Sequence, residues 1–256
     1  MATPHFSPRP GVKKLDRGIR KVAPTYGRAA FHTFAPKSHG AMVVESASER
    51  LVSQMLGLDP SVHSFEPQPF TVDLVQGDVL HTPEQKARAR KRDKVRGESS
   101  NFYTPDFLVR WSLGATTALE VKTQGWEGNE ASEHKLELAR NALGEHHIDF
   151  VRLIVPSSWR HPLLTTIPLL HQAARRSDLQ PDLHVMDQTE CLAANGACTL
   201  GEFCAGLGMD TRMAPVLIVF GAMRVDLLAH ELKSDTPAMP ACGDLDHLCL
   251  VEGLAQ

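Results

Sequence analysis

Three residues have the types and spacing needed to hydrolyse a phosphodiester. Asp106 follows Tyr103-Thr104-Pro105, and thirteen residues separate it from Glu120, which is followed by Val121 and Lys122. Paired carboxylates are the ligands that Mg²⁺ prefers, and a nearby lysine can orient the attacking water and favour its deprotonation. The residues alone also fit an ordinary hairpin with an aspartate at its turn and a solvated Glu-x-Lys face.

Two strands must position these residues. The segments FYTPDFLVRWSL and TTALEVKT are joined around Leu113-Gly114-Ala115, a short turn, and predict a hairpin with Asp106 at the start of one strand. Glu120 and Lys122 are two residues apart in the other strand, so they share a face. Val121 then points into the core, and its carbonyl is a candidate for a further metal ligand.

A helix with an inward-edge glutamate precedes the hairpin. The segment ESASERLVSQMLGLDP offers Ser46 or Ser48 as an N-cap, and Pro60 ends the helix. Apolar residues recur at helical spacing in the segment 51–56. Glu49 lies at the edge of this stripe and is the candidate helical carboxylate, with Glu45 as its competitor.

The remaining elements complete a mixed α/β unit. Alternating apolar residues predict a strand at 69–75. Apolar residues at helical spacing predict an amphipathic helix at 130–147, and an apolar run predicts a strand at 150–156. The basic stretch 86–96 is expected to be a long hairpin connection. The order α-β-β-β-α-β, ending in a crossover, predicts a mixed sheet flanked by helices in residues 41–156.

A helical region is expected at residues 157–256. A helix falls within 162–176, and another begins at Thr199 and ends at Gly208. The later two-residue alternation of Met223, Val225 and Leu227 makes this region similar to a winged helix-turn-helix.

The distribution of charge favours DNA as a partner more than the total does. The net charge is only −3. An N-terminal arm at 1–40 is nevertheless basic and almost free of acids, and a second basic run is interrupted only by Asp93. Such runs can neutralise DNA phosphates, although each can equally be a solvated loop. The candidate DNA-binding residues are Arg88, Arg90, Lys91 and Arg92.

Further features of the sequence indicate where the protein is located and which metal it binds. We expect a soluble, cytoplasmic protein, because no apolar run approaches the roughly 20 residues of a membrane helix and the first residues lack a secretory core. The five cysteines form no CxxC pair, which argues against a structural zinc site. Oxygen ligands favour Mg²⁺, with Mn²⁺ as a substitute.

The chain resembles a known superfamily of nucleases. Residues 45–155 look like the restriction-endonuclease fold of PD-(D/E)xK enzymes, and they are most similar to TnsA, the transposon-end endonuclease. The matching segments are ESASERLVSQMLGLDPSVHSFEPQPF, NFYTPDFLVRW and ALEVKTQ. The resemblance implies catalytic roles for Glu49, Asp106 and Lys122. It places a metal ligand at Glu120, where such enzymes have Gln or Glu, so the expected metal ligands are Glu49, Asp106, Glu120 and Val121.

The resemblance also implies a biological role. The enzyme would cleave double-stranded DNA at the 5′ ends of a transposon during cut-and-paste transposition. Its partners would be a DDE transposase (TnsB-like) and an AAA+ ATPase regulator (TnsC-like). Two alternatives stay open: a restriction or repair nuclease that acts alone, and a non-catalytic DNA-binding adapter. Gln68 is expected either to touch the phosphate or to make a strand-end hydrogen bond, and Trp111 and Trp126 are expected to pack.

Overall fold

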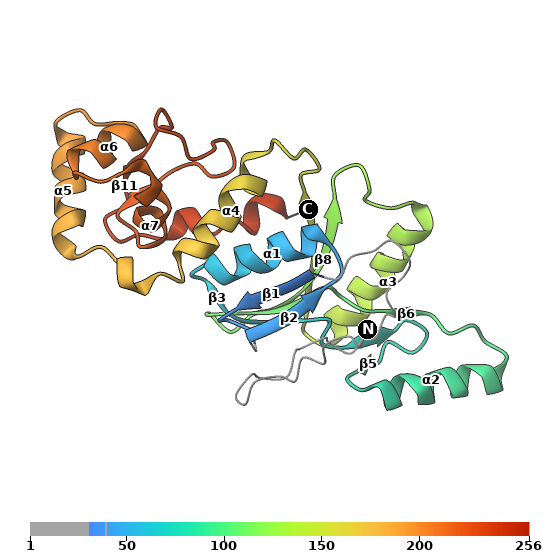
Figure 1. Cartoon of the computed structure of the whole chain (residues 1–256). Coiled ribbons are helices and arrows are strands. Elements are labelled where there is room, and N and C mark those ends of the chain that lie inside the picture. Colours follow the sequence, from blue (N-terminus) through green and yellow to red (C-terminus); the bar gives the residue numbers. More distant parts are fainter. Residues whose placement is uncertain (1–30, 39, 256) are drawn as a thin grey trace, which may run out of the picture.

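A four-stranded mixed sheet forms the centre of the protein (Figure 1). The computed structural model describes residues 31–38 and 40–255. The strands are β3 (Val62–Pro67), β7 (Phe107–Trp111), β8 (Thr116–Thr123) and β9 (Asp149–Val155), in that spatial order. Neighbouring strands are antiparallel except β8 and β9, which are parallel and joined through helix α3 (Glu130–Glu145).

Helices cover both faces of this sheet, as the sequence predicts. Helix α1 (Ala47–Leu58) packs on one face beside the hairpin of β1 (Phe31–Ala35) and β2 (Gly40–Val44). Side chains of β8 alternate, so that Leu119 and Val121 join the core beneath α1. Ala118 points the other way and joins the cluster beneath α3. The predicted mixed α/β architecture is therefore confirmed.

The first strand of the central sheet is not the one that the sequence predicts. That strand is β3, whereas the predicted segment 69–75 contributes only β4 (Thr71–Asp73) to a separate sheet with β5 (Val79–Leu80) and β6 (Phe102–Tyr103). Pro67 and Pro69 cannot donate to a strand ladder, and Gln68 between them has φ +43°. The chain therefore turns out of one sheet and into the other here.

The basic stretch 86–96 is helical, so the predicted hairpin connection is wrong. Helix α2 (Pro83–Arg96) starts at a capping box, in which Thr82 and Gln85 satisfy each other's backbone N–H groups. Gly97, with φ +75°, ends it. Alanine, lysine and arginine are all good helix formers, and this preference outweighs the mutual repulsion of the cations.

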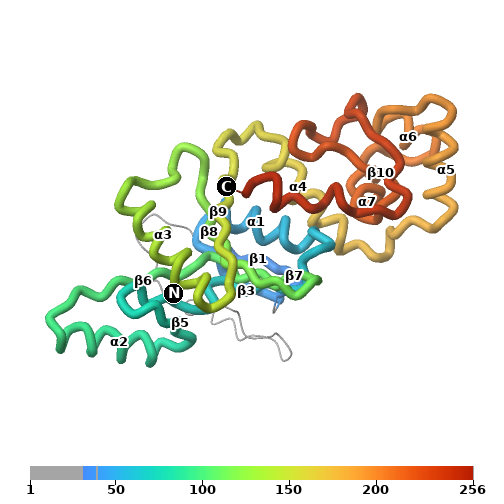
Figure 2. The backbone as a smooth tube through the Cα atoms, turned by 180° about the vertical axis from the view of Figure 1, so that it is seen from behind, coloured from blue at the N-terminus to red at the C-terminus, as the bar shows by residue number. Residues whose placement is uncertain are grey.

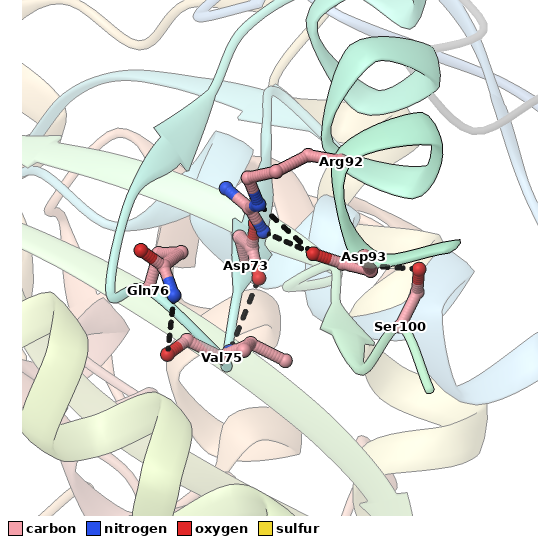
Figure 3. Close-up of polar contacts among 6 residues, drawn as sticks. All are labelled: Asp73, Val75, Gln76, Arg92, Asp93 and Ser100. Atoms are coloured by element: carbon pink, nitrogen blue, oxygen red, sulfur yellow. Dashed lines mark hydrogen bonds and ion pairs between the residues drawn. The ribbon is translucent and has the colours of Figure 1, made fainter. Parts of the chain in front are cut away.

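Helix α2 lies to one side of the molecule, tied to the small sheet by a buried network (Figure 3). The Arg92 guanidinium donates to Asp73 Oδ2 at 2.7 Å and to Asp93 Oδ1 at 2.6 Å. Ser100 Oγ donates to the other oxygen of Asp93 at 2.7 Å. Both carboxylates are 0% exposed, so Arg92 is their charge partner inside the protein.

The C-terminal region is mainly helical. Helix α4 (Pro162–Ala173) and the Thr199-capped helix fall where the sequence predicts them. Met223 is in the two-residue strand β10, which pairs with β11. The elements of this region are α4, α5 (Leu183–Ala194), α6 (Leu200–Gly206), α7 (Ala214–Val219), β10 (Met223–Arg224), β11 (Met239–Pro240) and the 3₁₀ turns η1 (Ser177–Leu179), η2 (Thr211–Met213), η3 (Asp246–Leu248) and η4 (Glu252–Leu254).

One hydrophobic core runs from the sheet into the C-terminal region. Helix α1 packs on α4, which packs on α7, and a single buried cluster extends from Ala35 to Val251. Figure 2 shows the chain end returning to the central sheet, where Ala255 bridges Leu153 of β9. Among the described residues, no helix has the length and apolar character to cross a bilayer. Residues 1–30, with most of the cations of the expected arm at 1–40, lie outside the described residues.

Candidate active site at one end of the central sheet

Asp106 is held by three backbone contacts just before β7. Its N–H donates to the carbonyl of Leu119 and its carbonyl accepts from the N–H of Gln68, both at 3.0 Å. The N–H of Val121 donates to Asp106 Oδ2 at 2.8 Å. The aspartate side chain thus points to the second half of β8, where Glu120 and Lys122 lie. This contact gives Val121 a backbone role through its N–H, while the proposed role of its carbonyl stays a prediction.

Glu120 and Lys122 share the face of β8 that turns towards α3. Lys122 Nζ lies 2.6 Å from Glu120 Oε1, and the side chain of Lys122 is 24% exposed. Glu120 is almost fully buried, and its Oε2 accepts a hydrogen bond of 2.8 Å from the Tyr103 hydroxyl. The glutamate is therefore fixed by a cation on one oxygen and a phenol on the other.

Tyr103 is a site residue that sequence reasoning missed. It lies in β6, at the end of the segment that includes α2, and its ring packs edge-on against Phe150 at 6.0 Å. Burial, together with the charge of Glu120, raises the pKa of the Tyr103 hydroxyl well above its ordinary value. The hydroxyl therefore stays protonated and donates. The sequence signal that could have identified Tyr103 is an aromatic residue three positions before Asp106.

Glu49 reaches the same end of the sheet from α1, on the opposite face. Its Oε2 accepts the N–H of Glu45 and its Oε1 accepts the Ser46 hydroxyl, both at 2.8 Å. The Ser46 hydroxyl in turn caps the N–H of Glu49. The start of α1 is pinned to the end of β8 by Ser48 and Thr123, whose hydroxyls are 2.7 Å apart. The Ser-x-x-Glu pattern thus also serves as a helix cap.

The three carboxylates influence one another electrostatically. Burial, followed by the charges of Glu120 and Glu49, raises the pKa of Asp106 well above its usual range, although the side chain keeps some exposure. Burial and the charges of Glu45 and Glu120 raise the pKa of Glu49, against the lowering effect of its two hydrogen bonds. Carboxylates that oppose each other's ionisation are a common sign of a functional site.

The donor types at this site suit a hard divalent cation. Within the described part of the chain, Asp106 Oδ1 accepts no hydrogen bond, whereas both oxygens of Glu49 and of Glu120 are engaged. No three acidic, histidine or cysteine side chains of the described residues are already arranged as metal ligands. Glu120, whose charge acts on Asp106, is a second candidate ligand. Glu49 is a third candidate, and all three are oxygen ligands of the kind that Mg²⁺ takes.

The expected DNA-binding residues divide into two groups on α2. Arg88, Arg90 and Lys91 are exposed, and Arg90 lies over the ring of Phe102 at 5.6 Å. Arg92 instead forms ion pairs with the two buried carboxylates of the anchoring network. The sequence run does not distinguish these roles, because the acids that bind Arg92 come from β4 and from the neighbouring position.

Three further residues that the sequence marked are now placed. Gln68 is 6% exposed beside the site, and its backbone N–H contacts Asp106, which fits the strand-end interpretation. Trp111 is partly buried and donates to the Thr117 hydroxyl at 2.8 Å. Trp126 is 80% exposed, so the expectation that it packs is wrong.

Comparison of the chain with models of known protein families and with curated proteins finds no match.

Proposed function

We propose that this protein is a metal-dependent DNA endonuclease of the PD-(D/E)xK type. The observation that carries the proposal is the meeting of Asp106, Glu120 and Lys122 at one end of a mixed sheet, with Glu49 approaching from the other face. A mixed sheet flanked by helices is compatible with the restriction-endonuclease-like fold in this proposal. Phosphodiester hydrolysis needs an oriented water and charge neutralisation, and this arrangement offers residues for both.

Each residue has a defined task in this proposal. Asp106, Glu120 and Glu49 would hold Mg²⁺, with the Val121 carbonyl as a further ligand, and Mn²⁺ can substitute. The bound cation would supply charge neutralisation on the phosphate. Lys122 orients the attacking water, and its ammonium group is held in position by Glu120. Tyr103 fixes Glu120 from the opposite side.

The resemblance to TnsA supports a more specific role. We propose that the substrate is double-stranded DNA at the 5′ ends of a transposon. A DDE transposase (TnsB-like) would process the other strand, and an AAA+ ATPase (TnsC-like) would regulate both. In this proposal the exposed cations of α2 bind the DNA backbone, and the C-terminal region acts as a winged-helix-like DNA-binding unit.

Cleavage of DNA that carries transposon ends, with the transposase and Mg²⁺ present, tests the proposal. Asp106→Ala and Lys122→Ala should each reduce cleavage at least roughly 10²-fold while the circular dichroism spectrum stays native. The matched control is Asp149→Ala, because Asp149 is exposed at the far end of the same sheet, paired with Thr117. Wild-type cleavage by both site variants would refute the catalytic assignment.

The same assay separates a transposition enzyme from a nuclease that acts alone. A transposition endonuclease should cut only when its transposase is added. Efficient cleavage by the isolated protein would instead identify a restriction or repair nuclease built on the same site.

A further inference from the structure

Two tryptophan side chains project into solvent near the candidate active site. Trp126 is 80% exposed and Trp159 is 73% exposed. The third tryptophan, Trp111, is partly buried and hydrogen-bonded. Large indole rings usually bury most of their surface, so two solvent-facing rings call for a ligand that covers them.

The parallel pairing of β8 and β9 brings both rings to one end of the sheet. Thr123 and Val155 are register partners at the ends of these strands, and Gln124 N–H donates to the Val155 carbonyl at 2.8 Å. Trp126 is three residues beyond Thr123 and Trp159 is four beyond Val155. Both segments leave the same end of the sheet in Figures 1 and 2, in green and in yellow. The Cα atom of each tryptophan therefore lies no more than roughly 14 Å from that end.

This is also the end at which the catalytic candidates lie. Glu120 and Lys122 are in the last half of β8, and Lys122 is one residue before Thr123. The turn that follows is fixed, because Trp126 N–H donates to the Thr123 carbonyl at 2.8 Å and Gly125 adopts φ +82°. The backbone of Trp126 is thus held close to the proposed cleavage chemistry.

A cation accompanies the second ring. The guanidinium of Arg160 lies over the indole of Trp159, 4.9 Å from its centroid, and Arg160 is itself exposed. Flat π faces combined with a guanidinium are the chemistry that binds nucleobases and their phosphates. In paired, stacked DNA each base face is covered by its neighbours, so an indole can stack only where a base is unpaired.

We propose that Trp126 and Trp159, with Arg160, stack on nucleobases that are unpaired beside the phosphodiester to be cut. The proposal rests on the proposed endonuclease function, which places DNA at this end of the sheet. It adds a local opening of the duplex at the cleavage position and names the residues that hold the opened bases.

Tryptophan fluorescence tests the proposal without cleavage. A chelator is added to prevent cleavage. The protein is then titrated with a 12-nucleotide single strand, a fully paired duplex and the same duplex with three mismatched pairs at the cut position. The single strand and the mismatched duplex should quench the emission. A Trp126→Phe/Trp159→Phe variant, which retains only Trp111, should show no quenching.

Binding constants from fluorescence anisotropy of labelled DNA supply the second measurement. Trp126→Ala and Trp159→Ala should each weaken binding of the mismatched duplex roughly 10-fold and of the paired duplex less than about 2-fold. The single phenylalanine variants should keep most of the affinity, because a smaller ring still stacks. Trp111→Phe is the matched control and should bind both duplexes as the wild type does.

The outcomes distinguish this inference from the function on which it rests. If the wild type binds or cleaves DNA while the two alanine variants bind mismatched and paired duplexes unchanged, the stacking proposal is overturned and the nuclease proposal stands. Unchanged emission during titration overturns it as well, and would leave the rings as a surface for a protein partner. A wild type that neither binds nor cuts any DNA refutes both.

Discussion

Replacing Tyr103 with phenylalanine removes one hydroxyl and leaves the ring in place. That hydroxyl donates to Glu120 Oε2 at 2.8 Å, and the two residues are 5% and 8% exposed. Water cannot readily replace the missing donor there. A hydrogen bond to a charged group contributes about 1.5–3 kcal/mol. Because Lys122 still pairs with the other oxygen of Glu120, we expect a decrease of about 2 kcal/mol in the free energy of unfolding.

Chemical denaturation of the metal-free protein measures this change. A decrease of that size should lower the melting temperature by roughly 4–8 °C in a chain of this length. A double-mutant cycle with Glu120→Ala, which removes the acceptor, isolates the hydrogen bond, and its coupling energy should be about 1 kcal/mol or more. The tyrosine variant should also cleave DNA more slowly, because the carboxylate then has one restraint in place of two.

Two results would refute the reasoning. A Tyr103→Phe protein as stable as the wild type would mean that the hydroxyl and the carboxylate are not bonded in solution. A decrease in stability with zero coupling to Glu120→Ala would mean that the hydroxyl matters for another reason.

The remaining predictions concern pH, metal and salt. The native state of metal-free protein holds a proton on Asp106 at pH values where the unfolded chain has released it, because the pKa is raised by burial and by the neighbouring charges. The stability associated with this group is therefore present at acidic pH and lost as the pH rises through the raised pKa. Asp106→Asn should be more stable than the wild type at pH 7.5 and less dependent on pH, whereas urea titrations that give identical curves would contradict this. Mg²⁺ at ten times its dissociation constant should stabilise the wild type by about 1.4 kcal/mol but should not stabilise Asp106→Ala. A zinc-selective chelator should leave the melting temperature of the wild type unchanged. Replacing Arg88, Arg90 and Lys91 with alanine should flatten the log–log salt dependence of DNA binding by roughly 0.9 for each phosphate that the variant no longer neutralises, and an unchanged slope would show that α2 does not touch the backbone.

The arrangement of the catalytic candidates was largely predictable, because it depends on local periodicity. The hairpin of β7 and β8 follows from alternating apolar residues around a glycine turn, and strand geometry then places Glu120 and Lys122 on one face. The Ser-x-x-Glu pattern is likewise local. It predicts both the start of α1 and the position of Glu49.

The errors arise where tertiary partners decide the outcome. The apolar alternation at 69–75 predicts a strand, and β4 does lie within this segment. The alternation does not say which sheet the strand joins, however, and β4 belongs to the small sheet. Asp93 reads as a minor interruption of a basic run, whereas its buried carboxylate accepts from Arg92 and Ser100. The hydrogen bond of Tyr103 with Glu120 spans seventeen positions between different sheets, and no local pattern encodes it.

The unbroken core between α1 and α4 limits how this protein can be dissected. Glu49 approaches the site because α1 packs on the sheet, and another surface of that helix is covered by α4, which follows Pro156 in the chain. A fragment ending at residue 156 would contain the catalytic candidates yet leave this surface open to water. The C-terminal region is thus part of the scaffold of the candidate catalytic glutamate, and exchanging it between related proteins would also require changes on the face of α1 that contacts α4.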